Sequence, residues 1–115
     1  MLTFIVNPAA GSGYAGKAWS LLEDELQRRG VKYCILHTEY PGHATELARN
    51  VAQKGESHTV VAVGGDGTAY EVACGLMDTG VALGIIPVGT GNDFIKPVTG
   101  MLWAPVEEVL RNGAT

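Results

Sequence analysis

The residues best suited to chemistry lie in the middle of the chain, where Gly64–Thr68 has the order Gly-Gly-Asp-Gly-Thr and directly follows the mostly apolar run His58–Val63. Apolar residues at helical spacing come next: Ala69, Val72, Ala73, Leu76 and Met77. Glycines between a strand and a helix bring backbone N–H groups close to a ligand, and the helix N-terminus adds a partial positive charge that suits phosphate. Because a carboxylate beside phosphates is repulsive without a cation between them, Asp66 indicates a nucleotide bound with Mg²⁺.

A second loop further along the chain repeats this pattern. The apolar run Val81–Ile86 is followed by Pro87–Phe94, which contains two glycines, the hydroxyl of Thr90 and the carboxylate of Asp93. Ligands of open α/β sheets bind outside the carboxyl ends of the strands. We therefore expect both loops to lie at one edge of a sheet.

The elements that position these loops alternate along the chain. Strands are predicted at Leu2–Val6, Lys32–His37, His58–Val63 and Val81–Ile86. Two helices are predicted between the first three strands, with the apolar faces Ala15, Ala18, Trp19, Leu22, Leu26 and Ala44, Leu47, Ala48, Val51, Ala52, ended by Gly30 and Gly55. A last helix is predicted from Pro105, with Val106, Val109 and Leu110 inward, to Gly113. The pattern predicts a three-layer, Rossmann-like α/β domain, with a parallel sheet in the order 2-1-3-4 and helices on both faces.

Composition indicates one globular domain that does not bind nucleic acid. The chain has 115 residues, 46% of them hydrophobic and 17% charged, with a net charge of −4. This charge offers no basic surface to nucleic acid and no standing attraction to an anionic membrane. Cys34 and Cys74 are interpreted as reduced core cysteines of a cytoplasmic protein, because they lie in a strand-like and a helix-like segment.

The first turn of the chain leaves two other interpretations to weigh. Gly11–Gly16 matches the dinucleotide fingerprint G-x-G-x-x-G, with Glu39 near the end of the second strand, but Asn7–Ala10 separates it from the strand end where the fingerprint begins. Gly11–Lys17 approaches a Walker A loop, yet position 18 is alanine, which has no hydroxyl for Mg²⁺. An NAD(H)-binding Rossmann module stays open as an alternative, and a turn that helps to cover a nucleotide is the simpler interpretation.

The motifs together resemble the diacylglycerol kinase family of lipid kinases, particularly the bacterial soluble type. The matching segments occur in the family's order: Asn7–Gly11, Thr38 with Gly42–Ala44, Gly64–Thr68 with Glu71, and Gly89–Phe94. The Gly-Gly-Asp-Gly-Thr segment alone is shared with NAD kinases, whereas the opening Asn-Pro and the Gly-Thr-Gly-Asn-Asp-Phe segment favour lipid kinases. Tyr70 departs from the asparagine that is usual in the family.

The resemblance implies an ATP site and a magnesium site. Its ATP-binding residues are Asn7, Pro8, Ala9, Ala10, Gly11, Thr38, Gly64, Gly65, Asp66, Gly67, Thr68, Ala69, Tyr70 and Thr90. By the same resemblance, Asp66 and Asp93 join a Mg²⁺ and water network. The implied reaction transfers the γ-phosphoryl group of ATP to a lipid hydroxyl such as that of diacylglycerol, which is mostly a matter of positioning and charge neutralisation.

The resemblance also implies a second, β-rich domain after residue 115. In the family that domain supplies the catalytic base, further carboxylates and the lipid pocket, so we expect no catalytic residue within these 115 residues and only transient contact with a membrane. An NAD kinase-like domain and a non-catalytic nucleotide-binding module stay open as alternatives. A parallel sheet cut short leaves an unpaired edge, so the region Ile95–Leu110 is expected to meet further protein and the chain to form a homodimer. A charged or short last strand that caps the edge is the alternative. Met101–Ala104 is expected to pack on protein or to touch a membrane.

Overall fold

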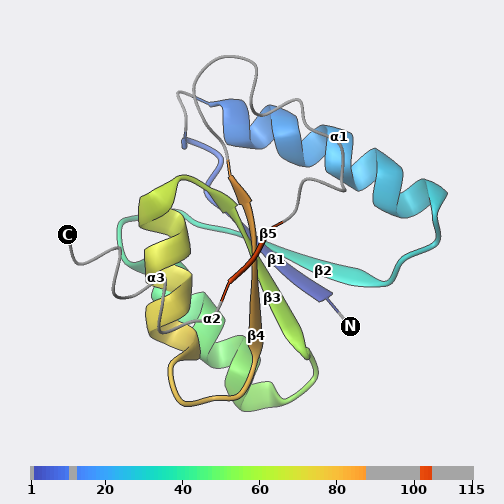
Figure 1. Cartoon of the computed structure of the whole chain (residues 1–115). Helices are drawn as coiled ribbons and strands as arrows, with labels where there is room; N and C mark the ends of the chain where they lie inside the picture. Colours follow the sequence, from blue (N-terminus) through green and yellow to red (C-terminus); the bar gives the residue numbers. More distant parts are fainter. Residues whose placement is uncertain (1, 11–12, 88–101, 105–115) are drawn as a thin grey trace.

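The computed structural model describes residues 2–10, 13–87 and 102–104, and these form a sheet with helices on both of its faces (Figure 1). The strands of the described part are β1 (Leu2–Val6), β2 (Tyr33–His37), β3 (Thr59–Gly64), β4 (Ala82–Pro87) and β5 (Leu102–Ala104). Its helices are α1 (Tyr14–Arg28), α2 (His43–Lys54) and α3 (Asp66–Leu76). None of the described helices is long and apolar enough to cross a membrane.

The strand order is β2-β1-β3-β4-β5. The first four strands pair in parallel, which confirms the predicted order 2-1-3-4. The observed second, third and fourth strands each begin one residue later than predicted, at Tyr33, Thr59 and Ala82. The third and fourth also end one residue later, at Gly64 and Pro87. The last predicted helix, from Pro105 to Gly113, lies outside the described residues.

Strand β5 is a correction to the sequence analysis. It pairs antiparallel with β4, with Gly84 opposite Trp103, so the edge of β4 that was expected to be unpaired is covered there. A three-residue strand held by backbone pairing is too short to show a two-residue period, so periodicity could not assign residues 102–104 to a strand. The expectation of an unpaired edge therefore does not hold beside β4, and the alternative, a short last strand that caps the edge, is the one observed.

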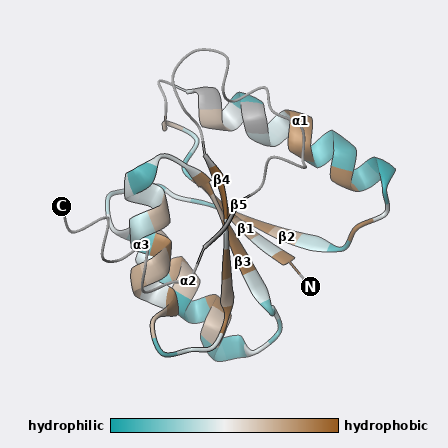
Figure 2. Ribbon diagram, viewed as in Figure 1, coloured by the Kyte–Doolittle hydropathy of each residue, from teal (hydrophilic) through white to brown (hydrophobic). Residues whose placement is uncertain are grey.

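Alternating residues of the central strands contribute their side chains to two hydrophobic cores, one on each face of the sheet. Phe4 and Val63 point toward α1, where they meet the Trp19 ring, whereas Ile5 and Val60 point toward α2 and α3. Figure 2 shows the hydrophobic colour concentrated on the strands and the hydrophilic colour on the outer surfaces of the helices. Burial on both faces explains why strands β1 and β3 are nearly continuous apolar runs.

The cysteines differ from their predicted burial. Cys34 is exposed and Cys74 is only half-buried, so neither belongs to the fully buried core. Cys34 lies on β2, which pairs only with β1 among the described strands and is therefore an edge strand with less cover than the central strands.

Candidate functional site

The predicted loops meet at the carboxyl edge of the parallel sheet. Strands β1, β2 and β3 end in register there, with Val6 paired to both His37 and Val63. Helices α1, α2 and α3 begin at the same edge, each preceded by a glycine, and none of the three has a side-chain capping hydrogen bond. Their first-turn N–H groups are therefore directed toward the edge without a side-chain acceptor, which favours an anionic ligand.

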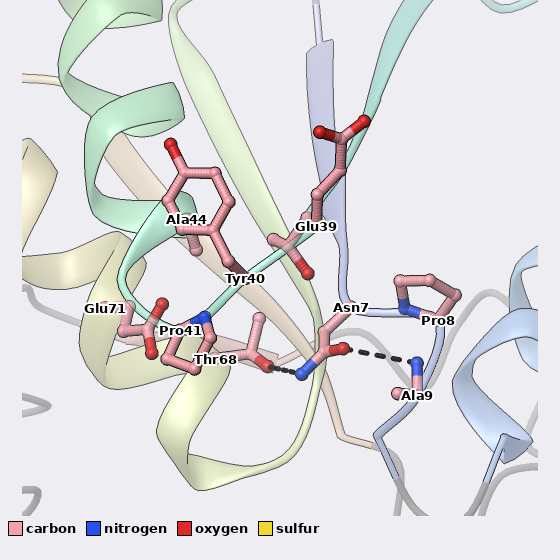
Figure 3. Close-up of a pocket in the computed structure, with 10 residues that line it drawn as sticks. Asn7, Pro8, Ala9, Glu39, Tyr40, Pro41, Ala44, Thr68 and Glu71 are labelled. Carbon is pink, nitrogen blue, oxygen red and sulfur yellow. Dashed lines mark hydrogen bonds between the residues drawn. The ribbon is translucent and has the colours of Figure 1, made fainter.

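Asn7 connects the first strand to the glycine-rich loop. Its backbone N–H donates to the Val63 carbonyl at 3.1 Å, so it continues the sheet by one residue beyond β1. Its side-chain oxygen accepts the Ala9 N–H at 3.2 Å, and its side-chain nitrogen donates to Thr68 Oγ1 at 3.4 Å (Figure 3). Asn7 thus holds the turn after β1 against the first turn of α3.

Thr68 occupies a position that only a glycine at residue 64 allows. Its side chain is buried, and a Cβ built at Gly64 would lie 2.5 Å from Thr68 Oγ1 and 2.8 Å from Thr68 Cβ. Such distances are far below ordinary van der Waals contact, so a larger residue at position 64 would displace the Thr68 hydroxyl. Gly64 was predicted to let a ligand approach the backbone closely. In the structure it leaves room for the Thr68 side chain.

A pocket of about 380 Å³ lies in front of these residues (Figure 3). Its lining residues are Asn7, Pro8, Ala9, Thr38, Glu39, Tyr40, Pro41, Ala44, Thr68 and Glu71. Thr38 reaches it because its N–H donates to the Val6 carbonyl at 2.9 Å, which extends β2 toward the same edge. The pocket thus gathers five residues proposed from the sequence, drawn from the turn after β1, the loop after β2 and the first turn of α3.

The other residues proposed from the sequence lie at different depths. Gly64 is buried at the end of β3, Gly65 precedes α3, and Asp66 and Gly67 are exposed in its first turn. Ala69 is buried in the core shared by α2 and α3, so its side chain faces away from solvent. Ala10 and Tyr70 are half-buried, and Tyr70 has a raised pKa because of a hydrogen bond with Cys74. Gly11, Thr90 and Asp93 lie outside the described residues.

Half of the residues that line the pocket were not predicted as site residues from the sequence. These residues are Glu39, Tyr40, Pro41, Ala44 and Glu71. Four of them follow the carboxyl end of β2 and could have been found from the rule that all parallel strands deliver their following loops to one edge. Glu71 lies one helical turn after Thr68, so helical spacing places both on one face of α3.

Two hydrogen bonds join Gly42, in the loop after β2, and Thr45, in the first turn of α2, to Glu71 on α3. The Gly42 N–H donates to Glu71 Oε1 at 3.2 Å, and the Thr45 hydroxyl donates to the Glu71 carbonyl at 2.7 Å. Gly42 has a φ of 87°, a left-handed conformation that favours glycine. Glu71 therefore fixes the shape of one wall of the pocket.

The charged residues that line the pocket are both acidic, namely Glu39 and Glu71. Phosphate groups in this pocket would need compensation by the α3 N-terminus and by a cation. Among the described residues there is no group of three or more histidine, cysteine, aspartate or glutamate side chains arranged to hold a metal. Mg²⁺ usually takes only one or two protein carboxylates and completes its shell with water and phosphate oxygens, so an exposed carboxylate such as Asp66 at this edge fits that ion.

Comparisons with known proteins agree with this geometry. The family model for the diacylglycerol kinase catalytic domain matches residues 1–113. The chain is 34% identical to a Bacillus subtilis (strain 168) protein named diacylglycerol kinase, covering 96% of this chain and 36% of that protein. It is 32% identical to sphingoid long-chain bases kinase 1 of Arabidopsis thaliana, covering 84% of this chain and 14% of that protein.

A solved structure shows the same architecture. The crystal structure of a diacylglycerol kinase from Bacillus anthracis str. Sterne superposes with a TM-score of 0.65 at 33% sequence identity, covering 79% of this chain and 34% of that chain. The chain thus spans about a third of the length of that protein and of its Bacillus subtilis relative. The matched model and these similarities show that the chain belongs to the diacylglycerol kinase catalytic domain family.

Proposed function

We propose that this chain is the ATP-binding part of a lipid kinase, which transfers the γ-phosphoryl group of ATP to a lipid hydroxyl such as that of diacylglycerol. The observation that carries the proposal is the Asn7–Thr68 contact beside the uncapped N-terminus of α3, at the edge where the pocket opens. Family membership supports the use of a nucleotide. The kinases named among its relatives act on diacylglycerol and on sphingoid bases, which supports a lipid acceptor.

Several groups at the pocket would bind the triphosphate together. Because Thr68 Oγ1 accepts from Asn7, its hydroxyl proton is left to donate to a phosphate oxygen. The first-turn N–H groups of α3 would meet a second oxygen, and Thr38 and Thr90 are proposed as further contacts. Asp66 and Asp93 are proposed to hold Mg²⁺ through water, and the ion would neutralise charge on the transferred group.

The acceptor site is proposed to lie in the part of the relatives that this chain does not match. Transfer needs a base near the lipid hydroxyl and a surface that positions the lipid. We propose a following β-rich domain for both tasks, with the whole enzyme in the cytoplasm and in transient contact with the membrane. Homodimer formation is a separate proposal, and the edge strands of the described sheet are β2 and β5 rather than β4.

ATP binding by Thr68→Val tests the site directly. The change keeps the shape of the side chain and removes the hydroxyl, so we expect affinity for ATP with Mg²⁺ to fall by about tenfold, as for loss of one hydrogen bond to a charged group. Thr59→Val is the matched control, because it makes the same change at the opposite end of β3. Equal ATP affinity in Thr68→Val and the unsubstituted chain would contradict the assignment.

Titration with NADH separates the proposal from a dinucleotide-binding module. We expect ATP to bind and NADH to produce no saturable change in its own fluorescence. Saturable NADH binding that ATP does not displace would favour the Rossmann alternative. ATP binding followed by phosphorylation of NAD, in a protein that contains the acceptor site, would instead favour an NAD kinase.

A further inference from the structure

Tyr40 presents an aromatic ring at the pocket. It lines the pocket together with Asn7 and Thr38, yet 49% of the residue is exposed. Figure 3 shows its ring on the side of the pocket opposite Pro8 and Ala9, with the hydroxyl directed away from the Asn7–Thr68 pair. A large aromatic surface that borders a pocket and stays open to solvent is a candidate for contact with a flat ligand.

The Tyr40 ring is held in place before any ligand arrives. The His43 ring stacks against it with centroids 4.3 Å apart and planes 13° apart. The His43 N–H donates to the Tyr40 carbonyl at 3.1 Å, and His43 Nδ1 accepts the Glu39 N–H at 2.9 Å. The Tyr40 hydroxyl donates to Glu46 Oε2. Contacts therefore fix one face of the Tyr40 ring, its hydroxyl group and its backbone carbonyl.

The backbone behind the ring is fixed as well. The Gly42 N–H bonds to Glu71 on α3, which is 29 residues further along the chain. A ring whose orientation is already fixed loses little conformational entropy when it packs on a ligand. Less of the favourable free energy of the contact is then offset, and the affinity is higher. The same contact ties the position of the ring to the helix whose N-terminus borders the pocket.

The pocket lining contains both apolar and acidic side chains. The apolar Pro41 and Ala44 lie near Tyr40 (Figure 3), and the acidic residues are Glu39, which precedes Tyr40 in the chain, and Glu71, which lies one helical turn after Thr68. Phosphates would be repelled by these carboxylates, whereas the glycine-rich turn before α3 attracts them. An uncharged, flat group suits the wall at Tyr40, and in a nucleotide that group is the base.

We propose that Tyr40, fixed by His43 and Glu46, is the platform on which the base of the bound nucleotide stacks while its phosphates lie at Gly64–Thr68. The inference rests on the proposed function, because it assumes a nucleotide in this pocket. It assigns the base end of the site to the loop after β2. Base stacking on an aromatic side chain is sequence-tolerant, so the platform supplies affinity for a base rather than discrimination between bases.

The test compares ATP with inorganic tripolyphosphate, which has the same phosphate chain and no base. Both ligands are titrated by calorimetry at one Mg²⁺ concentration into the unsubstituted chain, Tyr40→Ala, Tyr40→Phe and Leu21→Ala. Leu21 is 57% exposed on α1 and does not line the pocket, so its variant controls for loss of exposed apolar surface. We expect Tyr40→Ala to weaken ATP by about tenfold and tripolyphosphate by less than about twofold.

Phenylalanine keeps the ring and loses the hydrogen bond to Glu46, so Tyr40→Phe should recover most of the ATP affinity lost in Tyr40→Ala. Equal loss for ATP and tripolyphosphate in Tyr40→Ala would overturn the platform, as would unchanged ATP affinity. Failure of the unsubstituted chain to bind either ligand would overturn the proposed function together with the platform. Circular dichroism melts verify that each variant is folded at the temperature of the titrations.

Discussion

At the scale of single residues, neighbouring positions of the glycine-rich loop have different tasks. Gly64 leaves room for Thr68, and Thr68 accepts a hydrogen bond from Asn7. Asp66 is exposed in the first turn of α3, where the preceding Gly65 makes no side-chain cap. Asp66 therefore does not cap the helix through its side chain, as a structural aspartate would. Its contribution that remains to be tested is its negative charge at the carboxyl edge of the sheet.

Asp66→Asn tests that contribution of charge. We expect the Mg²⁺-dependent part of ATP affinity to fall by about tenfold, the size of one lost contact to a charged group. The melting temperature without ligand should fall by less than about 5 °C, because only the favourable charge at the helix N-terminus is removed. Calorimetry with and without Mg²⁺, beside a thermal melt, measures both. Unchanged Mg²⁺ dependence would show that Asp66 does not serve the metal.

The Tyr40–Glu46 contact predicts a shift in titration. The hydrogen bond to the Glu46 carboxylate favours the neutral phenol and raises the pKa of Tyr40 above its ordinary value of 10.0. The proton that Tyr40 donates in this contact is therefore present below pH 10 and is lost as pH rises through the raised pKa. Tyrosine-specific ¹³C NMR, with Tyr40→Phe for assignment, should show this pKa move back toward its ordinary value in Glu46→Gln. The same pKa in both proteins would contradict the contact.

At the scale of elements, one glycine sets the distance between the two helices that frame the pocket. A Cβ built at Gly75 on α3 would lie 2.5 Å from the Thr45 carbonyl oxygen and 2.7 Å from Ala48 Cβ on α2. The helices can therefore approach closely only with glycine at this position. This approach lets the Thr45 hydroxyl reach the Glu71 carbonyl and lets Arg49 donate to the Cys74 carbonyl at 3.0 Å.

Gly75→Ala should therefore destabilise the chain. The added methyl group meets backbone atoms that cannot rotate away, so the free energy of unfolding should fall by about 1–3 kcal/mol. Gly67→Ala is the matched control, because nothing lies within 4 Å of a Cβ built there and the first turn of a helix accepts alanine. Urea unfolding of both variants measures the difference. Equal stabilities would show that α2 and α3 separate at little cost.

At the scale of the whole molecule, a short antiparallel strand completes one side of the parallel sheet. Strand β5 covers β4, whereas β2 on the other side pairs only with β1 among the described strands. Open strand edges are sites of association between chains. The homodimer expected from the sequence therefore stays a prediction, with β2 and β5 in place of β4 as the edge strands of the described sheet.

Sedimentation velocity over a range of concentrations checks this association. A strand-to-strand contact is saturable, so the sedimentation coefficient should rise with concentration toward that of a dimer. A coefficient that stays at the monomer value throughout would contradict the prediction.

The share of the relatives that the chain spans leads to a prediction about activity. We expect the 115 residues alone to bind ATP and to transfer no measurable phosphate to diacylglycerol in mixed micelles, because positioning of ATP without an acceptor site leaves the transfer uncatalysed. Joining the chain to the remaining portion of its Bacillus subtilis relative should give activity, measured with radiolabelled ATP. Robust lipid phosphorylation by the 115 residues would show that they contain the acceptor site and base.

Local sequence patterns were sufficient to predict the layers, the strand order and the edge of the sheet where the candidate site lies. Helical and strand periods are local properties, so Leu2–Val6, Ala44–Ala52 and the run before Gly64 could be assigned from neighbouring residues alone. Parallel strands joined by helices then bring Asn7, Thr38 and Thr68 to one edge, because each connection returns the chain to the same starting side. The family resemblance rested on the same short motifs.

Which of these residues share a pocket, and which contacts hold them there, could not be predicted from local patterns and follows from the packing of the elements. Glu71 bonds to Gly42, and Tyr40 stacks on His43 beside the pocket, through contacts that depend on how closely α2 and α3 pack. Strand β5 likewise depends on backbone pairing with β4, and the exposure of Cys34 depends on the place of β2 at the edge of the sheet. Periodicity carries no information about such contacts, because they join residues that are distant in sequence and are set by packing in three dimensions.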